Sequence, residues 1–164
     1  MTFRNDDDEE RITPIGLARF AYEYIEAANV VDETIGAKEA YVRTSCVPAF
    51  YLAKHGIELT LKSFLRFKGV SVEELRREFG HDLKRALQKA RELGLDDHIQ
   101  LSRNENDALD VLIALDDEQG LRYIRTGPKQ FPSWAIVYPV AVRLHQAIAP
   151  LVGYHSFSAY VTRS

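Results

Sequence analysis

The chain has 164 residues, a formal net charge of −3 and 46% hydrophobic residues, an ordinary balance for one globular domain. A chain of this length buries roughly two thirds of its unfolded surface, so folding requires neither a metal nor a disulfide. The single cysteine, Cys46, excludes an internal disulfide framework and any multi-cysteine zinc site.

Signals for export or membrane insertion are not found in the sequence. The first residues, MTFRNDDDEER, are acidic, whereas a secretory signal is basic and then apolar. The most apolar stretch, residues 134–142, is shorter than the roughly 20 residues that span a bilayer. We therefore expect a cytoplasmic protein with no membrane partner.

Six segments of helical periodicity follow one another along the chain. Each begins at residues that can cap a helix, and most end near a glycine; in chain order they cover 13–36, 45–69, 71–80, 82–94, 102–120 and 132–152. Two of them begin with capping boxes, Ser71 with Glu74 and Ser102 with Glu105. Residues 37–46 fit either a helix or a linker.

These segments predict an all-α fold, an up-and-down bundle of five or six helices. We expect one domain over residues 13–152, between an acidic disordered tail (1–12) and a weakly ordered C-terminal tail (153–164). The predicted core residues repeat at helical spacing: Phe50, Ile57, Leu61, Phe64, Leu83, Leu87, Ala90, Leu112, Val137 and Leu144. The last segment is apolar nearly all round, which favours burial in the core or in a symmetric homodimer.

Two histidines and two carboxylates in the middle of the chain could in principle bind a metal: His55, Glu58, His81 and Asp82. The simpler interpretation is structural. Lys54, Glu58 and Lys62 are spaced four apart, as in an exposed or half-buried charge ladder. Asp82 at a helix start is most simply a cap. No closed ligand pattern or phosphate-binding glycine loop is present, so we expect no metal and no cofactor.

A cationic loop lies in a stretch from Leu121 to Ser164 that contains no acid. We give this name to Arg122, Tyr123, Arg125 and Lys129. Arginine forks bind phosphate in a bidentate manner, and an aromatic ring can stack on a base. The alternative is that these cations pair internally with the acids of residues 110–118.

The middle of the chain resembles HEPN-type domains. The residues that carry the resemblance are Pro48 to Leu65 (PAFYLAKHGIELTLKSFL), then Gly69, the "G-H-D-L" of residues 80–83 and the "L-R-Y" of residues 121–123. They cover about 80 residues in the order and spacing of the family. The resemblance implies an α-helical bundle, commonly dimeric, in toxin–antitoxin, phage-defence or RNA-processing systems. A protein partner, such as a cognate nucleotidyltransferase-type antitoxin, belongs to the same expectation.

Many HEPN domains are metal-independent ribonucleases with an arginine four to six residues before a histidine near the last long helix. In this chain the last helix has Arg143 and His145 with only one residue between them. Arg76 and His81 have the right spacing but lie on either side of a turn, so we interpret that match as accidental. In the family's arrangement, Glu58 would accept hydrogen bonds from the backbone near His81, and Lys62 would pair with Asp82. These four residues form the predicted structural polar cluster.

Three functions remain open from the sequence. The first is a non-catalytic HEPN-like module that dimerises and binds RNA or a protein. The second is a divergent ribonuclease with His81 or His145 as the base and Arg143 or the cationic loop against the phosphate, since histidine titrates near neutral pH. The third is a small-molecule or nucleotide-binding bundle with a pocket near Trp134.

Overall fold

The computed structural model describes residues 11–41, 44–117, 120–123 and 127–158, and this part of the chain is helical and contains no strand. The predicted all-α fold is therefore confirmed. The elements are α2 (Pro14–Val31), η1 (Asp32–Gly36), η2 (Glu39–Tyr41), α3 (Val47–Phe67), α4 (Val72–Glu74), η3 (Leu75–Phe79), α5 (Leu83–Glu92), η4 (Leu95–Asp97), α6 (Arg103–Asp117), α7 (Trp134–Ile148) and η5 (Ala149–Val152).

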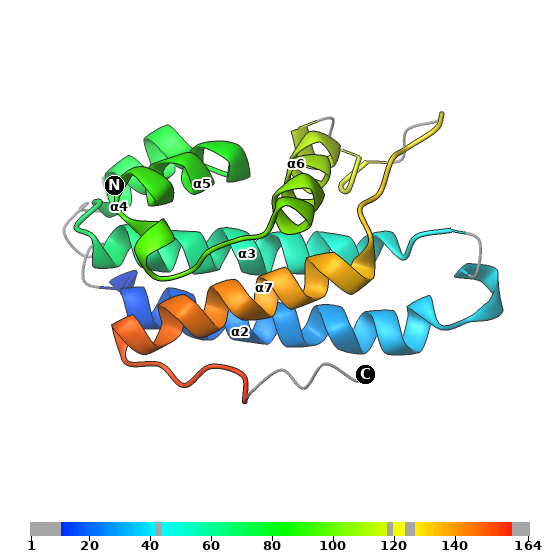
Figure 1. Cartoon of the computed structure of the whole chain (residues 1–164), viewed down its shortest axis with the longest axis horizontal. Helices are drawn as coiled ribbons and strands as arrows, with labels where there is room; N and C mark the ends of the chain where they lie inside the picture. Colours follow the sequence, from blue (N-terminus) through cyan, green and yellow to red (C-terminus); the bar gives the residue numbers. More distant parts are fainter. Residues whose placement is uncertain (1–10, 42–43, 118–119, 124–126, 159–164) are drawn as a thin grey trace, which may run out of the picture.

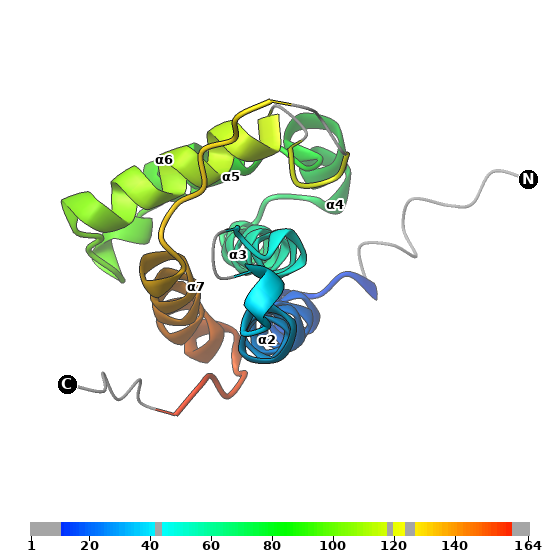
Figure 2. The same ribbon diagram turned by 90° about the vertical axis from the view of Figure 1, so that its right-hand side faces the viewer.

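Helix α3 is the centre of the molecule. On one side it packs against α2 and α7, and the three helices lie side by side (Figure 1). On the other side it is covered by α5 and α6, as the end-on view in Figure 2 shows. Helix α6 crosses α3 steeply instead of running along it. Side chains of α3 therefore face neighbours in both layers.

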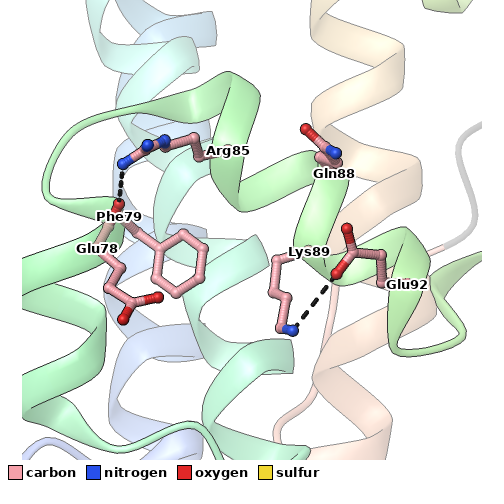
Figure 3. Close-up of a pocket in the computed structure, with 6 residues that line it drawn as sticks. All are labelled: Glu78, Phe79, Arg85, Gln88, Lys89 and Glu92. Carbon is pink, nitrogen blue, oxygen red and sulfur yellow. Dashed lines mark hydrogen bonds and ion pairs between the residues drawn. The ribbon is translucent and has the colours of Figure 1, made fainter.

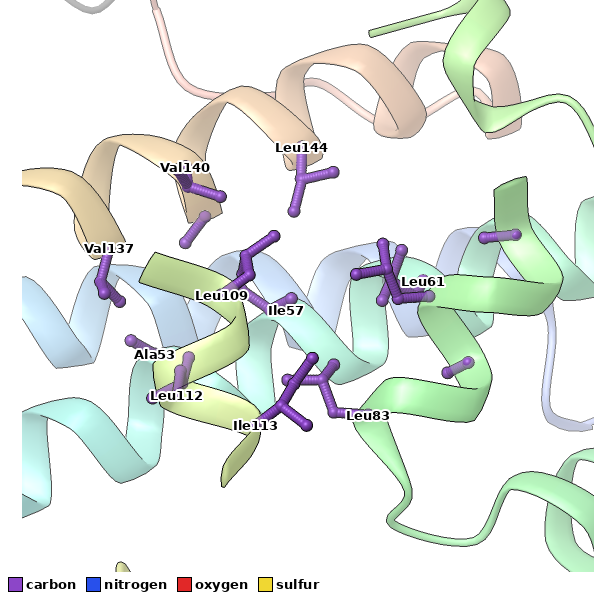
Figure 4. Close-up of a cluster of buried hydrophobic side chains, with 14 of the residues drawn as sticks. Ala53, Ile57, Leu61, Leu83, Leu109, Leu112, Ile113, Val137, Val140 and Leu144 are labelled. Atoms are coloured by element: carbon purple, nitrogen blue, oxygen red, sulfur yellow. The ribbon is translucent and has the colours of Figure 1, made fainter. Parts of the chain in front are cut away.

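The hydrophobic core fills the space between the two layers (Figure 4). All ten predicted core residues are buried, which confirms that part of the sequence analysis. The side chains labelled in Figure 4 come from α3, α5, α6 and α7. The core thus joins segments that are far apart in the sequence and fixes α3 relative to the start of α5.

Predicted caps are present at four helix starts, one of them Asp82 at the start of α5. The Thr13 hydroxyl accepts from the backbone N–H of Gly16 at 3.1 Å, and Ser71 accepts from Glu74 at 3.0 Å. Ser102 and Glu105 form a reciprocal capping box. The segments after the caps are less regular than predicted, because residues 32–36 and 75–79 are π-helical.

Helix α7 is covered in large part within one chain. It packs against α2, α3 and α6, which bury residues such as Val137, Val140 and Leu144, whereas Trp134, Ile136 and Tyr138 are only partly buried. Phe157 stacks on Tyr22 with 4.3 Å between ring centroids, although it belongs to the segment that we predict to be weakly ordered. Much of the apolar surface of α7 is therefore used inside one chain, and the homodimer stays a prediction.

One helix in the described part of the chain, Trp134–Val152, is long and apolar enough to cross a membrane by length and composition alone. It extends past the shorter stretch, residues 134–142, on which the sequence analysis relied. A core helix of a soluble protein meets the same criterion, and the finding assigns no location. Cytoplasmic localisation stays a prediction.

Candidate functional site

A buried ionic network lies on the face of α3 that points toward α5 and α6. The Lys54 ammonium lies 2.9 Å from Glu58 Oε2, and the Lys62 ammonium lies 2.8 Å from Glu58 Oε1. Lys54 and Glu58 are each only 1% exposed. Spacing of four residues places the three side chains on one face of the helix. Glu58 is therefore held between two cations in the interior.

The network continues into α6 through Asp116. Its Oδ2 lies 2.9 Å from the Lys54 ammonium, which therefore contacts two carboxylates. The Asp116 Oδ1 atom is buried and has no hydrogen-bond partner. A buried charge is stable only when it is paired, so Lys54 ties the end of α6 to α3.

Glu58 remains ionised in this setting. Burial favours its neutral form, but His55, with Nδ1 3.9 Å from Oε2, and the ammonium groups of Lys54 and Lys62 outweigh it. The pKa of Glu58 consequently lies well below its ordinary value of 4.5. The carboxylate is a permanent acceptor for the groups around it.

The same carboxylate orients His81 at the start of α5. His81 Nδ1 lies 3.1 Å from Glu58 Oε1, and a carboxylate only accepts, so Nδ1 carries the hydrogen. Lys62 also donates to the carbonyl of Gly80, and Lys54 donates to that of His81 at 3.4 Å. The imidazole is 63% exposed, and among the described residues its hydrogen bond is the one at Nδ1.

The exposed side of this network forms one end of a pocket of about 450 Å³. Nine residues line it: Ile12, Leu17, Leu59, Lys62, Val72, Leu75, Arg76, Gly80 and His81. Apolar side chains from α2, α3, α4 and η3 make the walls. Among the described residues of its lining, the charged or ionisable side chains are Lys62, Arg76 and His81. Arg76 and His81, whose spacing we interpreted as accidental, thus line the same pocket.

The predicted polar cluster is present only in part. Glu58, Lys62 and His81 come together, but Lys62 contacts the carbonyl of Gly80 and not Asp82. Asp82 instead caps α5, accepting from the backbone N–H of Arg85 at 3.0 Å. Glu58 accepts from side chains and not from the backbone near His81.

Two members of the network were missed from the sequence, Lys54 as a buried cation and Asp116 as its partner. The ladder that we expected to be exposed or half-buried is buried at Lys54 and Glu58. The signal that could have revealed this is the position of Lys54 next to Ala53 and Ile57, which belong to the apolar face of α3. No short-range pattern in the sequence links Lys54 with Asp116.

The catalytic candidates on α7 are held in structural contacts. His145 is fully buried; its Nε2–H donates to the carbonyl of Ala18 at 2.8 Å, and Ser156 donates to Nδ1 at 2.7 Å. Burial lowers the pKa of His145, against the hydrogen bond to Ala18, which raises it. Arg143 pairs with Glu105 and donates to the carbonyl of Gln100 at 3.1 Å. Both ring nitrogens of His145 and both terminal nitrogens of Arg143 thus have internal partners.

The cationic loop is described in part. Arg122 and Tyr123 are exposed, and Arg122 makes no ion pair with a described residue. Lys129 donates to the carbonyl of Gly120 at 3.2 Å, while Arg125 lies outside the described residues. Asp116, an acid that we considered as an internal partner for these cations, pairs with Lys54 instead.

Other hollows in the described structure are lined by charges of both signs. The pocket in Figure 3, of about 300 Å³, contains Glu78 and Glu92 beside Arg85 and Lys89. Arg85 donates to the carbonyl of Glu78 at 3.1 Å, and Lys89 pairs with Glu92 at 3.4 Å. These cations therefore already have partners.

Two further expectations concern ligands. Trp134, near which a small-molecule pocket was predicted, packs edge-on against Phe50 with 5.2 Å between ring centroids. Among the described residues, no group of three or more His, Cys, Asp or Glu side chains is arranged to hold a metal ion.

Comparison with known proteins gave no relative: no protein-family model, curated protein or solved structure matches the chain.

Proposed function

We propose that the protein is a non-catalytic, HEPN-like helical module that binds RNA through its cationic loop. The observation that carries this proposal is the exposure of Arg122 and Tyr123 at the end of α6, where Arg122 has no ion-pair partner among the described residues. Internal pairing was the competing explanation. It is weakened for Asp116, because this carboxylate pairs with Lys54.

The non-catalytic part of the proposal is supported by the contacts of α7. A general base needs an accessible ring nitrogen, and an arginine that binds a scissile phosphate needs free donors. His145 uses both ring nitrogens internally, and Arg143 is tied to Glu105 and Gln100.

The test is binding of a fluorescently labelled single-stranded RNA at low salt, measured by anisotropy. Binding through about three cations gives a log–log salt slope of roughly −2 to −3. The double variant Arg122→Ala/Arg125→Ala should lose most of the affinity. A matched control, Arg19→Ala/Arg103→Ala, removes two exposed arginines on other helices and should bind like wild type. Equal losses in both double variants would contradict the proposal, as would no binding by wild type.

A second candidate function, a divergent metal-independent ribonuclease, is favoured by one observation. Arg76 and His81 line one pocket, and Glu58 orients the imidazole through its contact at Nδ1. Such an imidazole could act as a general base. Metal-independent RNA cleavage that is lost in His81→Ala would favour this candidate over the first.

The symmetric homodimer and a protein partner, such as a nucleotidyltransferase-type antitoxin, belong to the same proposal. Apolar surface for an interface remains on α2, where Ile15, Phe20 and Val30 are 44%, 49% and 52% exposed. Sedimentation of the protein at tens of micromolar should show a dimer. At this concentration the method detects association with a free energy of about −6 to −7 kcal/mol. A monomer at all such concentrations would contradict the dimer.

A further inference from the structure

The pocket beside His81 has the walls of a small-molecule site. Its apolar lining comes from four separate segments: Ile12 and Leu17 at the start of the bundle, Leu59 on α3, Val72 on α4 and Leu75 on η3. A volume of about 450 Å³ lies within the range of sites for small ligands. An apolar part of a ligand would leave water on entering it.

The described residues at the polar end of the pocket are hydrogen-bond donors. Lys62, Arg76 and His81 line it, and none of the nine lining residues is aspartate or glutamate. The Lys62 ammonium has three N–H groups, of which Glu58 and the Gly80 carbonyl engage two. Glu58 is also neutralised from behind by Lys54, so its charge does not dominate the pocket.

The donors at this end are fixed in place. Glu58 holds both the Lys62 ammonium and the His81 ring, and the Gly80 carbonyl holds Lys62 from the other side. Fixed donors lose little conformational freedom on binding, which favours affinity. Three other pockets have carboxylates in their lining and are therefore less suited to an anion. Their carboxylates are Glu78 and Glu92 in the first, Asp110 in the second, and Asp96 and Asp110 in the third.

We propose that this pocket binds a small amphiphilic anion, a carboxylate or phosphate group carried on a short apolar chain. The anionic group would lie against Lys62, Arg76 and His81, and the chain would lie along Leu59, Val72 and Leu75. Carboxylate and phosphate share the oxygen geometry that an arginine fork recognises. The site is separate from the cationic loop, so its test is independent of RNA binding.

The first experiment titrates the full-length protein with octanoate and with octyl phosphate by isothermal calorimetry. Octanol has the chain without the charge, and inorganic phosphate has the charge without the chain. Octanol should bind at least about tenfold more weakly than octanoate, because a hydrogen bond to a charged group contributes roughly that factor. Inorganic phosphate should bind at least about tenfold more weakly than octyl phosphate, because it has no apolar chain to bury. The stronger of the two amphiphiles identifies the head group.

Chain length tests the apolar walls separately. Butyrate, hexanoate and octanoate should increase in affinity by about fourfold for each additional buried methylene. Equal affinity across the series would contradict a role for the apolar walls, and so would octanol binding as tightly as octanoate.

The variants test the polar end. Arg76→Ala should weaken octanoate and octyl phosphate binding by roughly tenfold or more. Arg77→Ala is the matched control, since Arg77 is the next residue, is exposed and pairs with Glu73 and Glu78 outside the pocket lining. Its affinity should stay within about twofold of wild type, since it loses only exposed ion pairs. Equal effects of the two variants, or no binding of either amphiphile by wild type at about 5 mM, a concentration well above the Kd of a weak specific site, would overturn the proposal.

Discussion

Glu58 is the residue on which the buried network depends, because it is the shared partner of Lys54, Lys62 and His81. Glu58→Gln leaves the Lys62 ammonium without its carboxylate in a mostly buried site. Breaking a buried ion pair in this way costs about 3–5 kcal/mol of folding free energy. The loss is measured as the difference in unfolding free energy between wild type and Glu58→Gln in denaturant titrations.

The control for this variant is Glu92→Gln, which breaks an exposed pair with Lys89 on α5. It should change the free energy of unfolding by less than about 1 kcal/mol. Similar values for the two variants would contradict the structural role of Glu58.

His145 gives a prediction about pH. Its pKa in the folded protein is lowered by burial from the ordinary 6.5. The unfolded chain therefore binds a proton more readily, so stability is full above pH 6.5 and falls as the pH drops below it. In His145→Gln this contribution is absent. Unfolding free energies at pH 7.5, 6.5 and 5.5 should fall less steeply for His145→Gln than for wild type. Parallel profiles would contradict the buried neutral state of His145.

At the level of single residues, the sequence predicted that Glu58, Lys62 and His81 belong together and that Asp82 caps a helix. Only the predicted pairing of Asp82 with Lys62 is wrong. An aspartate at a helix start can either cap the helix or pair with a lysine. In the folded chain Asp82 caps α5. The position of Lys54 beside Ala53 and Ile57 is a signal for its burial. Its pairing with Asp116 was not predictable, because Asp116 lies on α6, far along the sequence.

At the level of elements, the contact between α2 and α3 depends on Gly56. A Cβ atom there would lie 2.5 Å from Ile25 Cγ1 and 3.3 Å from the carbonyl of Ala21. Gly56→Ala gains helix propensity, but forcing a methyl into a packed contact costs about 1–3 kcal/mol. We expect a net loss of thermal stability. A gain of about 1 kcal/mol, as at an exposed helix position, would show that the two helices separate easily.

The helix positions could be predicted because caps and glycines are local signals. The caps at Thr13, Ser71 and Ser102 act within three residues of their partners. The π-helical segments could not, since their apolar residues still follow an approximately helical period.

At the level of the whole molecule, composition and periodicity predicted an all-α protein but not its arrangement. Helix α6 crosses α3, and this crossing brings Asp116 to Lys54 (Figure 2). The apolar faces of α7 suggested a dimer from the sequence, yet the tail around Phe157 and three helices cover a large part of them. Periodicity identifies the apolar face of a helix, but it does not specify which neighbouring element covers that face.

The central claim, a non-catalytic binding module, is tested most directly by incubating the protein with single-stranded RNA in a chelator and following cleavage by gel. We predict that wild type yields no more product than a control without protein, because His145 and Arg143 are engaged internally. Cleavage that is lost in both His81→Ala and Arg76→Ala but kept in Arg77→Ala would contradict this account and place a ribonuclease site in the pocket.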